Sequence, residues 1–330
     1  MAGAMIDQVL LAIDGGGTRT RCLAVTRLGV VIGRAEAGAS NDLQVGPGVA
    51  LASIEQALRE ALDSGGVSRD RVAAVAAGLA GVDADGTGAG HWTDAFLAMG
   101  FPAAFVHGDM IAAHRGALAN APGIVAVAGT GSVVVGIGAD GAMVKVGGWG
   151  PIYGNEGSAY WIGREGLRAA ARAADGRGPQ TALVARLGTR LGVGSFTRSI
   201  DAVYGRSMGQ QEIAALAPEV HAAAEAGDAS AAQVCAAAAA DLAEAVIAAV
   251  ARLGSAEART VSYQGGLLLD CPLIRTEFEL RLRHAVLDLR PPQHPPVVGA
   301  FLLGCRSLGW DPAPALHRLS APAGLRSERT

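Results

Sequence analysis

The chain has 330 residues, of which 17% are charged and 4% are aromatic, and its formal net charge is −3. This length predicts roughly two domains, and the near balance of charge lacks the basic field with which proteins hold nucleic acid. Nucleic acid is therefore not an expected partner. The single lysine, Lys145, lies in no sequence context that suits a Walker A loop or a pyridoxal Schiff base.

Membrane and secretory features are not expected. The most apolar stretch, 229–251, is interrupted by Asp241 and Glu244, so it predicts a buried helix and not a membrane span. The four cysteines form no C-x-x-C pair and no zinc-ligand spacing, and residues 1–8 lack the basic and apolar regions of a signal peptide. We therefore expect a cytoplasmic protein with no membrane partner.

The first 120 residues alternate between extended and helical patterns. Apolar runs predict strands at 9–14, 20–25 and 30–37, and their short turns indicate an antiparallel meander. Apolar spacing predicts a helix over 47–64, with Pro47 near its first turn. Strands and helices then alternate, with expected ranges of 72–79 (strand), 91–99 (helix), 104–107 (strand) and 110–119 (helix).

The same strand, glycine turn and strand pattern begins again after residue 120, at 124–137, which indicates an internal duplication. We therefore expect one domain at 1–120 and a second at 121–330, with a disordered tail after about residue 319. The second domain is enlarged by helices. Its remaining expected elements are strands at 143–146 and 260–264 and helices at 156–174, 181–191, 211–225, 228–253 and 273–287 and from 298.

The segment LLAIDGGGTRTRCLAV places Asp14, Gly15, Gly16, Gly17 and Thr18 between two predicted strands. Glycines let the backbone turn tightly and present N–H groups to an anion. Asp14 could hold a hydrated metal ion beside that anion. A nucleotide phosphate with magnesium is the natural ligand, and an ordinary glycine-rich hairpin is the alternative.

The segment VAVAGTGSVVVG repeats this arrangement, with Gly129, Thr130, Gly131 and Ser132 between two apolar strands. A second phosphate loop facing the first would clamp a triphosphate between two domains. Matching positions in the two halves strengthen this interpretation. Farther along, Gly265 and Gly266 follow a predicted strand and permit close approach of a flat ligand, although tight helix–strand packing would also explain them.

Two further segments carry polar side chains near predicted helix starts. Asp109, in FVHGDMIAAH, lies between a strand and a helix, where it would act as a base or as a helix N-cap. In GGWGPIYGNEGSAYW, Asn155 and Glu156 precede a helix whose N-terminus favours anions. Asn155 and Glu156 could bind sugar hydroxyls, and helix capping by Asn155 is the plainer alternative.

Together these segments resemble the sugar-kinase, Hsp70 and actin ATPase superfamily, and more closely the N-acetylglucosamine kinases of the BadF/BadG/BcrA/BcrD ATPase family. The resemblance runs from LAIDGGGT to PPVVGAFLLG. It implies an α/β fold of two ribonuclease-H-like domains around a cleft, as in actin-like ATPases.

The resemblance also assigns roles to the segments above. It places the catalytic base on Asp109 and the magnesium contact, through water, on Asp14. The implied ATP contacts are Asp14 to Thr18, Gly129 to Ser132, Gly265 and Gly266. The implied sugar contacts are Asn41 of GASND, Asp109, Thr130, Gly147, Gly148, Asn155 and Glu156.

Three residues depart from the family pattern. Asn155 stands where the family has aspartate, and an amide replaces one acceptor oxygen by a donor. Val133 stands where the animal enzymes have asparagine, which removes a polar contact to the sugar. Gly108 precedes Asp109 where the family usually has asparagine.

The implied activity is transfer of the ATP γ-phosphoryl group to the 6-hydroxyl of N-acetylglucosamine, with Mg²⁺. The resemblance also suggests a homodimer, because related kinases are often dimers. Glucosamine kinase is the nearest alternative, because a free amine differs from the acetamide only at carbon 2. An ATP-hydrolysing activator of a partner dehydratase is an alternative of another class, but Cys22, Cys235, Cys271 and Cys305 are not clustered as its iron–sulfur site requires. A sugar-sensing regulator would need a DNA-binding segment that the sequence before residue 9 does not show.

Overall fold

The computed structural model describes residues 8–254 and 259–319. Their contacts form two compact units: unit 1 has residues 8–121 and 291–319, and unit 2 has the described residues between 122 and 290. The expected division at 1–120 and 121–330 is thus corrected at its end, because the last long helix packs on the first sheet. Two expectations concern residues outside the described ranges. These are the absence of a signal peptide at residues 1–7 and the disorder of the tail after residue 319.

Unit 1 is built on a five-stranded sheet with the order β3-β2-β1-β4-β5. The β1, β2 and β3 strands pair antiparallel, which confirms the expected meander. The β4 strand pairs parallel with β1, and β5 pairs parallel with β4. The strands are β1 (Val9–Gly15), β2 (Thr20–Thr26), β3 (Val31–Ala37), β4 (Val72–Leu79) and β5 (Ala104–Gly108).

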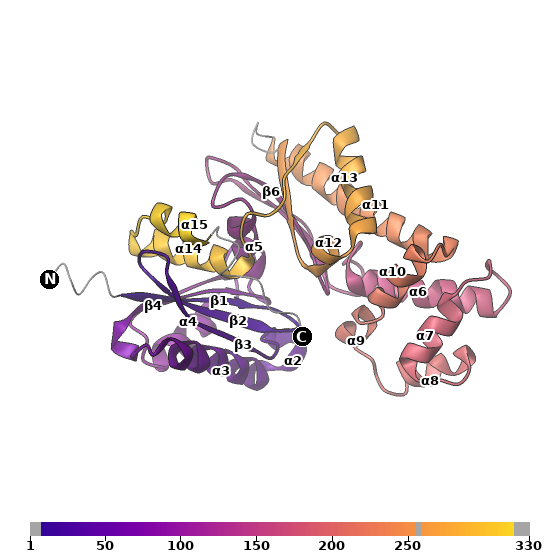
Figure 1. Cartoon of the computed structure of the whole chain (residues 1–330), viewed down its shortest axis with the longest axis horizontal. Coiled ribbons are helices and arrows are strands. Elements are labelled where there is room, and N and C mark those ends of the chain that lie inside the picture. The colour runs from indigo at the N-terminus through magenta and orange to yellow at the C-terminus, as the bar shows by residue number, and fades with distance from the viewer. Residues whose placement is uncertain (1–7, 255–258, 320–330) are drawn as a thin grey trace. The chain divides into compact units, whose positions relative to one another are not determined.

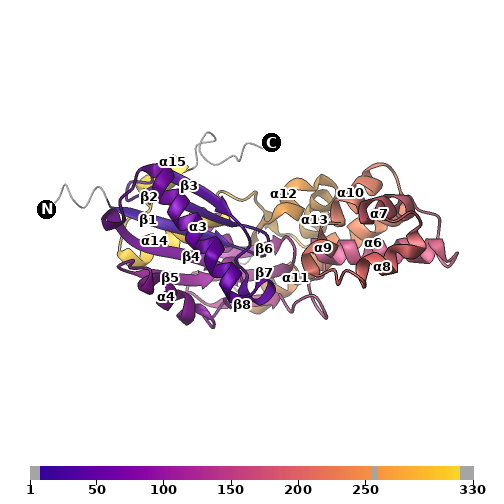
Figure 2. The same ribbon diagram turned by 90° about the horizontal axis from the view of Figure 1, so that it is seen from below.

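Helices cover both faces of this sheet (Figure 1). Leu11 belongs to a core shared with Ile54 of α3 and Phe96 of α4, and Figure 2 looks onto α3. The neighbouring side chain, Leu10, packs against Gly304 of α14. Because successive strand side chains point to opposite faces, α14 lies on the other face, together with α5. The helices are α2 (Asp42–Val45), α3 (Pro47–Gly65), α4 (Ala89–Ala98), α5 (Asp109–Ala117), α14 (Pro296–Leu308) and α15 (Ala313–Leu319), with a 3₁₀ turn at Arg69–Arg71.

The sheet of unit 2 has the order β8-β7-β6-β9-β10, which repeats the order of unit 1. Its first three strands again pair antiparallel, and β9 and β10 are again added in parallel. The expected internal duplication is therefore confirmed by topology. The strands are β6 (Gly123–Ala128), β7 (Ser132–Ile137), β8 (Met143–Gly147), β9 (Thr260–Gln264) and β10 (Asp288–Leu289).

The longest helix of unit 2, α11 (Ala229–Leu253), packs against β6, β7 and β8. Among the described residues it is the one helix long and apolar enough to span a membrane by length and composition. One of its faces, which includes Val234, Leu242 and Val246, is buried in the core. It is therefore a core helix, as expected. The other helices are α6 (Ala159–Ala174), α7 (Leu183–Leu191), α8 (Ser199–Val203), α9 (Gln210–Ala214), α10 (Ala217–Glu225), α12 (Gly266–Asp270) and α13 (Pro272–His284), with a 3₁₀ turn at Phe196–Arg198.

Most expected helices differ from the structure by one to three residues at an end, and two of the differences have a clear local cause. The helix expected at 211–225 is divided into α9 and α10, and Pro218 lies in the first turn of α10, where a missing N–H costs nothing. The helix expected from residue 156 begins at Ala159, because Ser158 caps it by accepting a hydrogen bond from the Trp161 N–H at 3.2 Å.

The crossing of α5 and α14 depends on glycine. A Cβ atom on Gly299 would overlap the Ala112 carbonyl oxygen and would lie 2.6 Å from the Gly116 nitrogen. We predict that Gly299→Ala lowers the free energy of unfolding by about 2–4 kcal/mol, because backbone cannot move away as a flexible side chain can. Urea denaturation followed by circular dichroism measures the change.

The matched control is Gly90→Ala in α4, where an added Cβ meets nothing within 4 Å. Alanine favours the helix there, so this variant should be as stable as the parent or more stable by up to about 1 kcal/mol. Equal stability of the two variants would contradict the close-crossing interpretation.

Candidate active site

The first glycine turn joins β1 to β2. Asp14 and Gly15 end β1, and the Gly16 N–H donates to the Arg19 carbonyl at 3.0 Å, which closes the turn. Gly17 lies against the Gln44 side chain, so that a Cβ there would clash with it at 2.5 Å. The residues expected to form the first phosphate loop, Asp14 to Thr18, thus lie together in one tight turn at the end of β1.

Asp14 and Asp109 lie at the same edge of the unit 1 sheet. Asp14 is in register with Gly78 of β4, and Gly78 is in register with His107 of β5. Asp109 follows two residues later, as the first residue of α5. A Cβ on Gly78 would overlap the Ala112 side chain, so glycine at this position allows α5 to lie close to the sheet.

The Asp14 carboxyl is strongly perturbed by its surroundings. Burial raises its pKa to about 6; Arg21 and Arg19 act to lower the pKa, and Asp109 raises it. Loss of hydration and a second carboxylate both disfavour its negative charge. A cation bound at this edge would relieve both effects.

This donor set fits a hydrated magnesium ion. Within the described ranges, no three His, Cys, Asp or Glu side chains form a group that could enclose a metal ion. Mg²⁺ commonly keeps several waters and binds one or two carboxylates together with substrate phosphates. Asp14, with Asp109 acting on it, matches that mode of binding.

Asp109 is not the N-cap of α5. The cap is Gly108, which has an extended backbone, and the Asp109 Oδ1 accepts a hydrogen bond from the Met110 N–H at 2.7 Å. The capping alternative for Asp109 is therefore wrong. Its carboxylate is oriented by the first turn of α5 and stays at the edge that holds Asp14.

Asn41 has a local structural role. Its Oδ1 accepts from the Leu43 N–H at 3.2 Å and thereby caps α2. It lies beside Gly81, two residues beyond the end of β4, because a Cβ on Gly81 would lie 3.6 Å from the Asn41 Oδ1. Asn41 is therefore at the same end of the parallel strands as Asp14 and Asp109.

In unit 2, the second glycine turn joins β6 to β7. The Gly129 N–H donates to the Gly131 carbonyl at 2.9 Å. The first two N–H groups of α6 donate hydrogen bonds to backbone carbonyls of this turn. The Ala159 N–H donates to the Gly129 carbonyl at 2.9 Å, and the Tyr160 N–H donates to the Thr130 carbonyl at 3.2 Å. These N–H groups of α6 hold protein carbonyls, which corrects the expectation that this N-terminus favours an anion.

The segment before α6 packs against this turn. Asn155 is 5% exposed and has a φ of 60°, a conformation that asparagine tolerates better than most residues. Its Oδ1 would lie 3.0 Å from a Cβ on Gly131, and the Ser132 hydroxyl donates to the Glu156 carbonyl at 2.6 Å. The structure thus brings Asn155 and Glu156 to the second turn, and it shows that Ser158, not Asn155, caps α6.

Gly265 also approaches the second turn. Its φ is 94°, and a Cβ there would overlap the carbonyl oxygen of Ala128, the residue before Gly129. Glycine at 265 is therefore required by backbone packing, which was the plainer interpretation of this motif. Gly266 begins α12.

A cavity of about 400 Å³ adjoins these segments. It contains Ser132, Gly147 and Glu156, which were expected from the sequence, and two acids that were not, Asp241 and Glu244 of α11. The sequence showed the two acids only as interruptions of an apolar run. The full lining is Ser132, Val133, Val134, Val146, Gly147, Trp149, Glu156, Asp241, Leu242, Glu244, Ala245 and Ala248.

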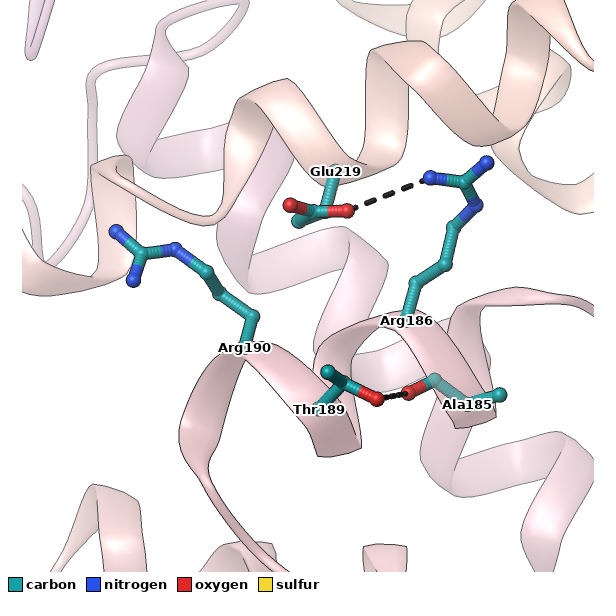
Figure 3. A pocket seen from close by; sticks show the side chains of 5 residues that line it. All are labelled: Ala185, Arg186, Thr189, Arg190 and Glu219. Atoms are coloured by element: carbon teal, nitrogen blue, oxygen red, sulfur yellow. Dashed lines mark hydrogen bonds and ion pairs between the residues drawn. The ribbon is translucent and has the colours of Figure 1, made fainter.

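A second cavity in unit 2, of about 490 Å³, lies between α7 and α10 (Figure 3). Arg186 pairs with Glu219 at 3.4 Å across it, and Thr189 and Arg190 extend from α7. It contains none of the expected site residues, so its greater size does not make it the candidate active site.

Two units of one strand order, each with a glycine turn after its central strand, define the fold of actin-like ATPases and sugar kinases. The chain belongs to the BadF/BadG/BcrA/BcrD ATPase family, whose model matches residues 11–304. ATP use follows from this membership.

Known proteins of similar sequence are amino-sugar kinases. The chain is 29% identical to the N-acetyl-D-glucosamine kinase of Dictyostelium discoideum over 68% of this chain and 73% of that protein. It is 30% identical to the N-acetylmuramic acid/N-acetylglucosamine kinase of Clostridium acetobutylicum over 66% of this chain and 72% of that protein. A Chromobacterium violaceum structure, described there as a proposed N-acetylglucosamine kinase, superimposes with a TM-score of 0.75 at 29% identity, covering 90% of this chain and 98% of that one.

The raised pKa of Asp14 predicts a pH-dependent stability in the ligand-free protein. A carboxyl whose native pKa, about 6, exceeds its ordinary value of 3.8 favours folding when protonated, and this contribution is lost as the pH rises through 6. We expect Asp14→Asn to exceed the parent in unfolding free energy by about 2 kcal/mol at pH 7.5, with the difference vanishing near pH 4. Urea denaturation at both pH values, without nucleotide or metal, measures it.

Asp94→Asn, on the exposed face of α4, serves as the control. Its difference from the parent should be small at both pH values. A difference for Asp14→Asn that does not change with pH would argue against a desolvated carboxylate at position 14.

Proposed function

We propose that this protein transfers the γ-phosphoryl group of ATP to the 6-hydroxyl of an amino sugar. The observation that carries the proposal is the placement of Asp14 and Asp109 at one edge of the unit 1 sheet in a chain of this ATPase family. N-acetylglucosamine is the first expected acceptor, and glucosamine is the alternative. The names of the relatives support an acceptor of this class.

Asp109 is the proposed catalytic residue. Its carboxylate accepts the proton of the 6-hydroxyl while the oxygen of that hydroxyl bonds to the γ-phosphorus and the bond to the β-phosphate oxygen breaks, which releases ADP. The transition state of such transfers is loose, so the base mainly orients the hydroxyl and takes its proton late. The hydrogen bond from Met110 N–H fixes the carboxylate for this role.

The phosphate groups are assigned to the two glycine turns. Backbone N–H groups of Asp14 to Thr18 and of Gly129 to Ser132 would bind phosphate oxygens and stabilise the charge that spreads over them in the transition state. Gly265 and Gly266 are proposed to lie against the nucleoside. Magnesium, held by Asp14 through water, would supply Lewis-acid neutralisation of that charge.

The sugar is assigned to Asn41, Thr130, Gly147, Gly148, Asn155 and Glu156, together with Asp109. The cap formed by Asn41 uses its Oδ1, which leaves the amide NH₂ as the group that would donate to a hydroxyl. At position 155 an amide offers one donor and one acceptor, so a hydroxyl that donates to an aspartate elsewhere in the family would here meet a different partner.

A cytoplasmic location and a homodimeric state complete the proposal as predictions. The activator alternative gains no support from the cysteines. Cys22 and Cys305 are buried in unit 1, whereas Cys235 and Cys271 belong to unit 2, so the shared cluster site of such an activator is not suggested by their placement.

The test is ADP release with magnesium-ATP and a panel of sugars, in the parent and in Asp109→Asn. Asparagine keeps the oxygen that accepts from Met110 N–H but cannot take a proton, so we expect kcat for the preferred amino sugar to fall about 10²–10⁴-fold with KM little changed. Asp94→Asn, the exposed control, should keep the parent rate.

If no sugar in the panel stimulates ADP release, the kinase assignment is refuted. Equal rates in Asp109→Asn and the parent would instead leave a kinase whose base is another residue. Loss of activity on removal of Mg²⁺ by EDTA, with recovery when Mg²⁺ is restored, is the expected result for the metal.

A further inference from the structure

The cavity of about 400 Å³ in unit 2 is lined by acidic and apolar side chains together. Asp241 and Glu244 of α11 line it with Glu156, and among the described residues no lysine, arginine or histidine does so. Val133, Val134 and Leu242 are among its apolar lining residues, and Trp149 also lines it. Val133 is one of the residues that departs from the family pattern. An apolar side chain in place of a polar one at this position strengthens the electric field of nearby carboxylates.

The charges in this cavity are not neutralised by the protein. Within the ranges 8–254 and 259–319, none of Glu156, Asp241 and Glu244 forms an ion pair within 4.0 Å. Burial raises the pKa of Asp241, and Glu156, Glu244 and Glu165 raise it further. Glu165 is itself paired with Arg164 and Arg168, so the uncompensated charge is that of the three lining carboxylates.

Two basic residues that lie close in sequence to the lining residues Val146 and Ala248 are already engaged. Arg252 donates through its Nη1 to the Lys145 carbonyl at 2.7 Å, and Lys145 is in contact with other described residues. Neither lines the cavity. Three carboxylates that line one cavity together with Trp149 therefore present a site suited to a small organic cation.

We propose that this cavity binds a protonated amino group of the acceptor, so that the enzyme takes the free amino sugar glucosamine and uses Asp241 and Glu244 to recognise its ammonium. The inference rests on the proposed function, because Gly147 and Glu156 of the cavity are the residues assigned to the sugar. Continuity with those two residues places the cavity next to the acceptor and not at a separate site.

Donor and acceptor chemistry distinguishes the possible sugars. An ammonium has three donors and no acceptor, and carboxylates are acceptors only, so the two are complementary. An acetamide presents a carbonyl oxygen that finds no donor among these three side chains. An acceptor with a carboxylate, such as N-acetylmuramate, is repelled by them. The geometry thus ranks a free amine above an acid.

The experiment compares glucosamine, N-acetylglucosamine and N-acetylmuramate with the full-length protein at pH 7. Asp241→Asn and Glu244→Gln keep size and remove charge. We expect each to lower kcat/KM for glucosamine about tenfold, mainly through KM, and to change that for N-acetylglucosamine by less than about twofold. The control, Glu219→Gln in the cavity of Figure 3, should leave both values unchanged.

Isothermal titration calorimetry with glucosamine and no nucleotide gives a readout besides turnover. Weaker glucosamine binding in both variants, with unchanged N-acetylglucosamine binding, supports the ammonium site. Glu244 lies on the exposed side of α11, so Glu244→Gln tests the proposal even if Asp241→Asn does not fold.

The outcomes separate this inference from the proposed function. Two results overturn the ammonium site and leave the kinase intact. One is phosphorylation of N-acetylglucosamine without any binding of glucosamine. The other is a ratio of kcat/KM for glucosamine to kcat/KM for N-acetylglucosamine that is the same in both variants as in the parent. Glucosamine binding that depends on Asp241, with no sugar phosphorylated, supports the site and overturns the kinase. Neither binding nor turnover of any sugar overturns both.

Discussion

The burial of the Asp14 carboxyl in unit 1, with the Asp109 carboxyl acting in the same direction, is the constraint on which the candidate site depends. The parallel strands β1, β4 and β5 end at one edge, and their register brings Asp14 and the start of α5 there. The apolar core formed by α3, α4 and the sheet offsets the free-energy cost of holding these two carboxyl groups close together. A protein selected for stability alone would place an amide at one of the two positions. The pair is therefore one of the observations that support the proposed magnesium contact at this edge.

The two units share a strand order but not their chemistry. The residue before the first glycine of the turn is Asp14 in unit 1 and Ala128 in unit 2. The acids of unit 2 come from outside its sheet, from α11 and from the segment before α6. The duplicated scaffold thus provides two similar glycine turns, and the residues around each turn have diverged to different tasks.

The sequence was sufficient for local structure and insufficient for long-range packing. Apolar runs and glycine turns predicted the strands, because a central strand such as β1, covered on both faces, has an almost unbroken apolar sequence. The pattern of α14 showed that it is buried but not that it returns to the first sheet, since amphipathicity does not name a helix's partner. Asp241 and Glu244 were visible as charges in an apolar helix, yet their place in a cavity depends on how α11 crosses β7 and β8. Nothing local distinguished Asn155 from Ser158 as the cap of α6.

The return of the chain to unit 1 has a consequence for biosynthesis. A ribosome delivers residues 8–121 first, but the helix that covers one face of their sheet, α14, is made only after all of unit 2. Until then Leu10 and Ala76, which pack against Gly304, remain uncovered. Unit 2 is continuous in sequence and can complete its core while the chain is still attached. Unit 1 can therefore complete its packing only after the whole of unit 2 has been synthesised.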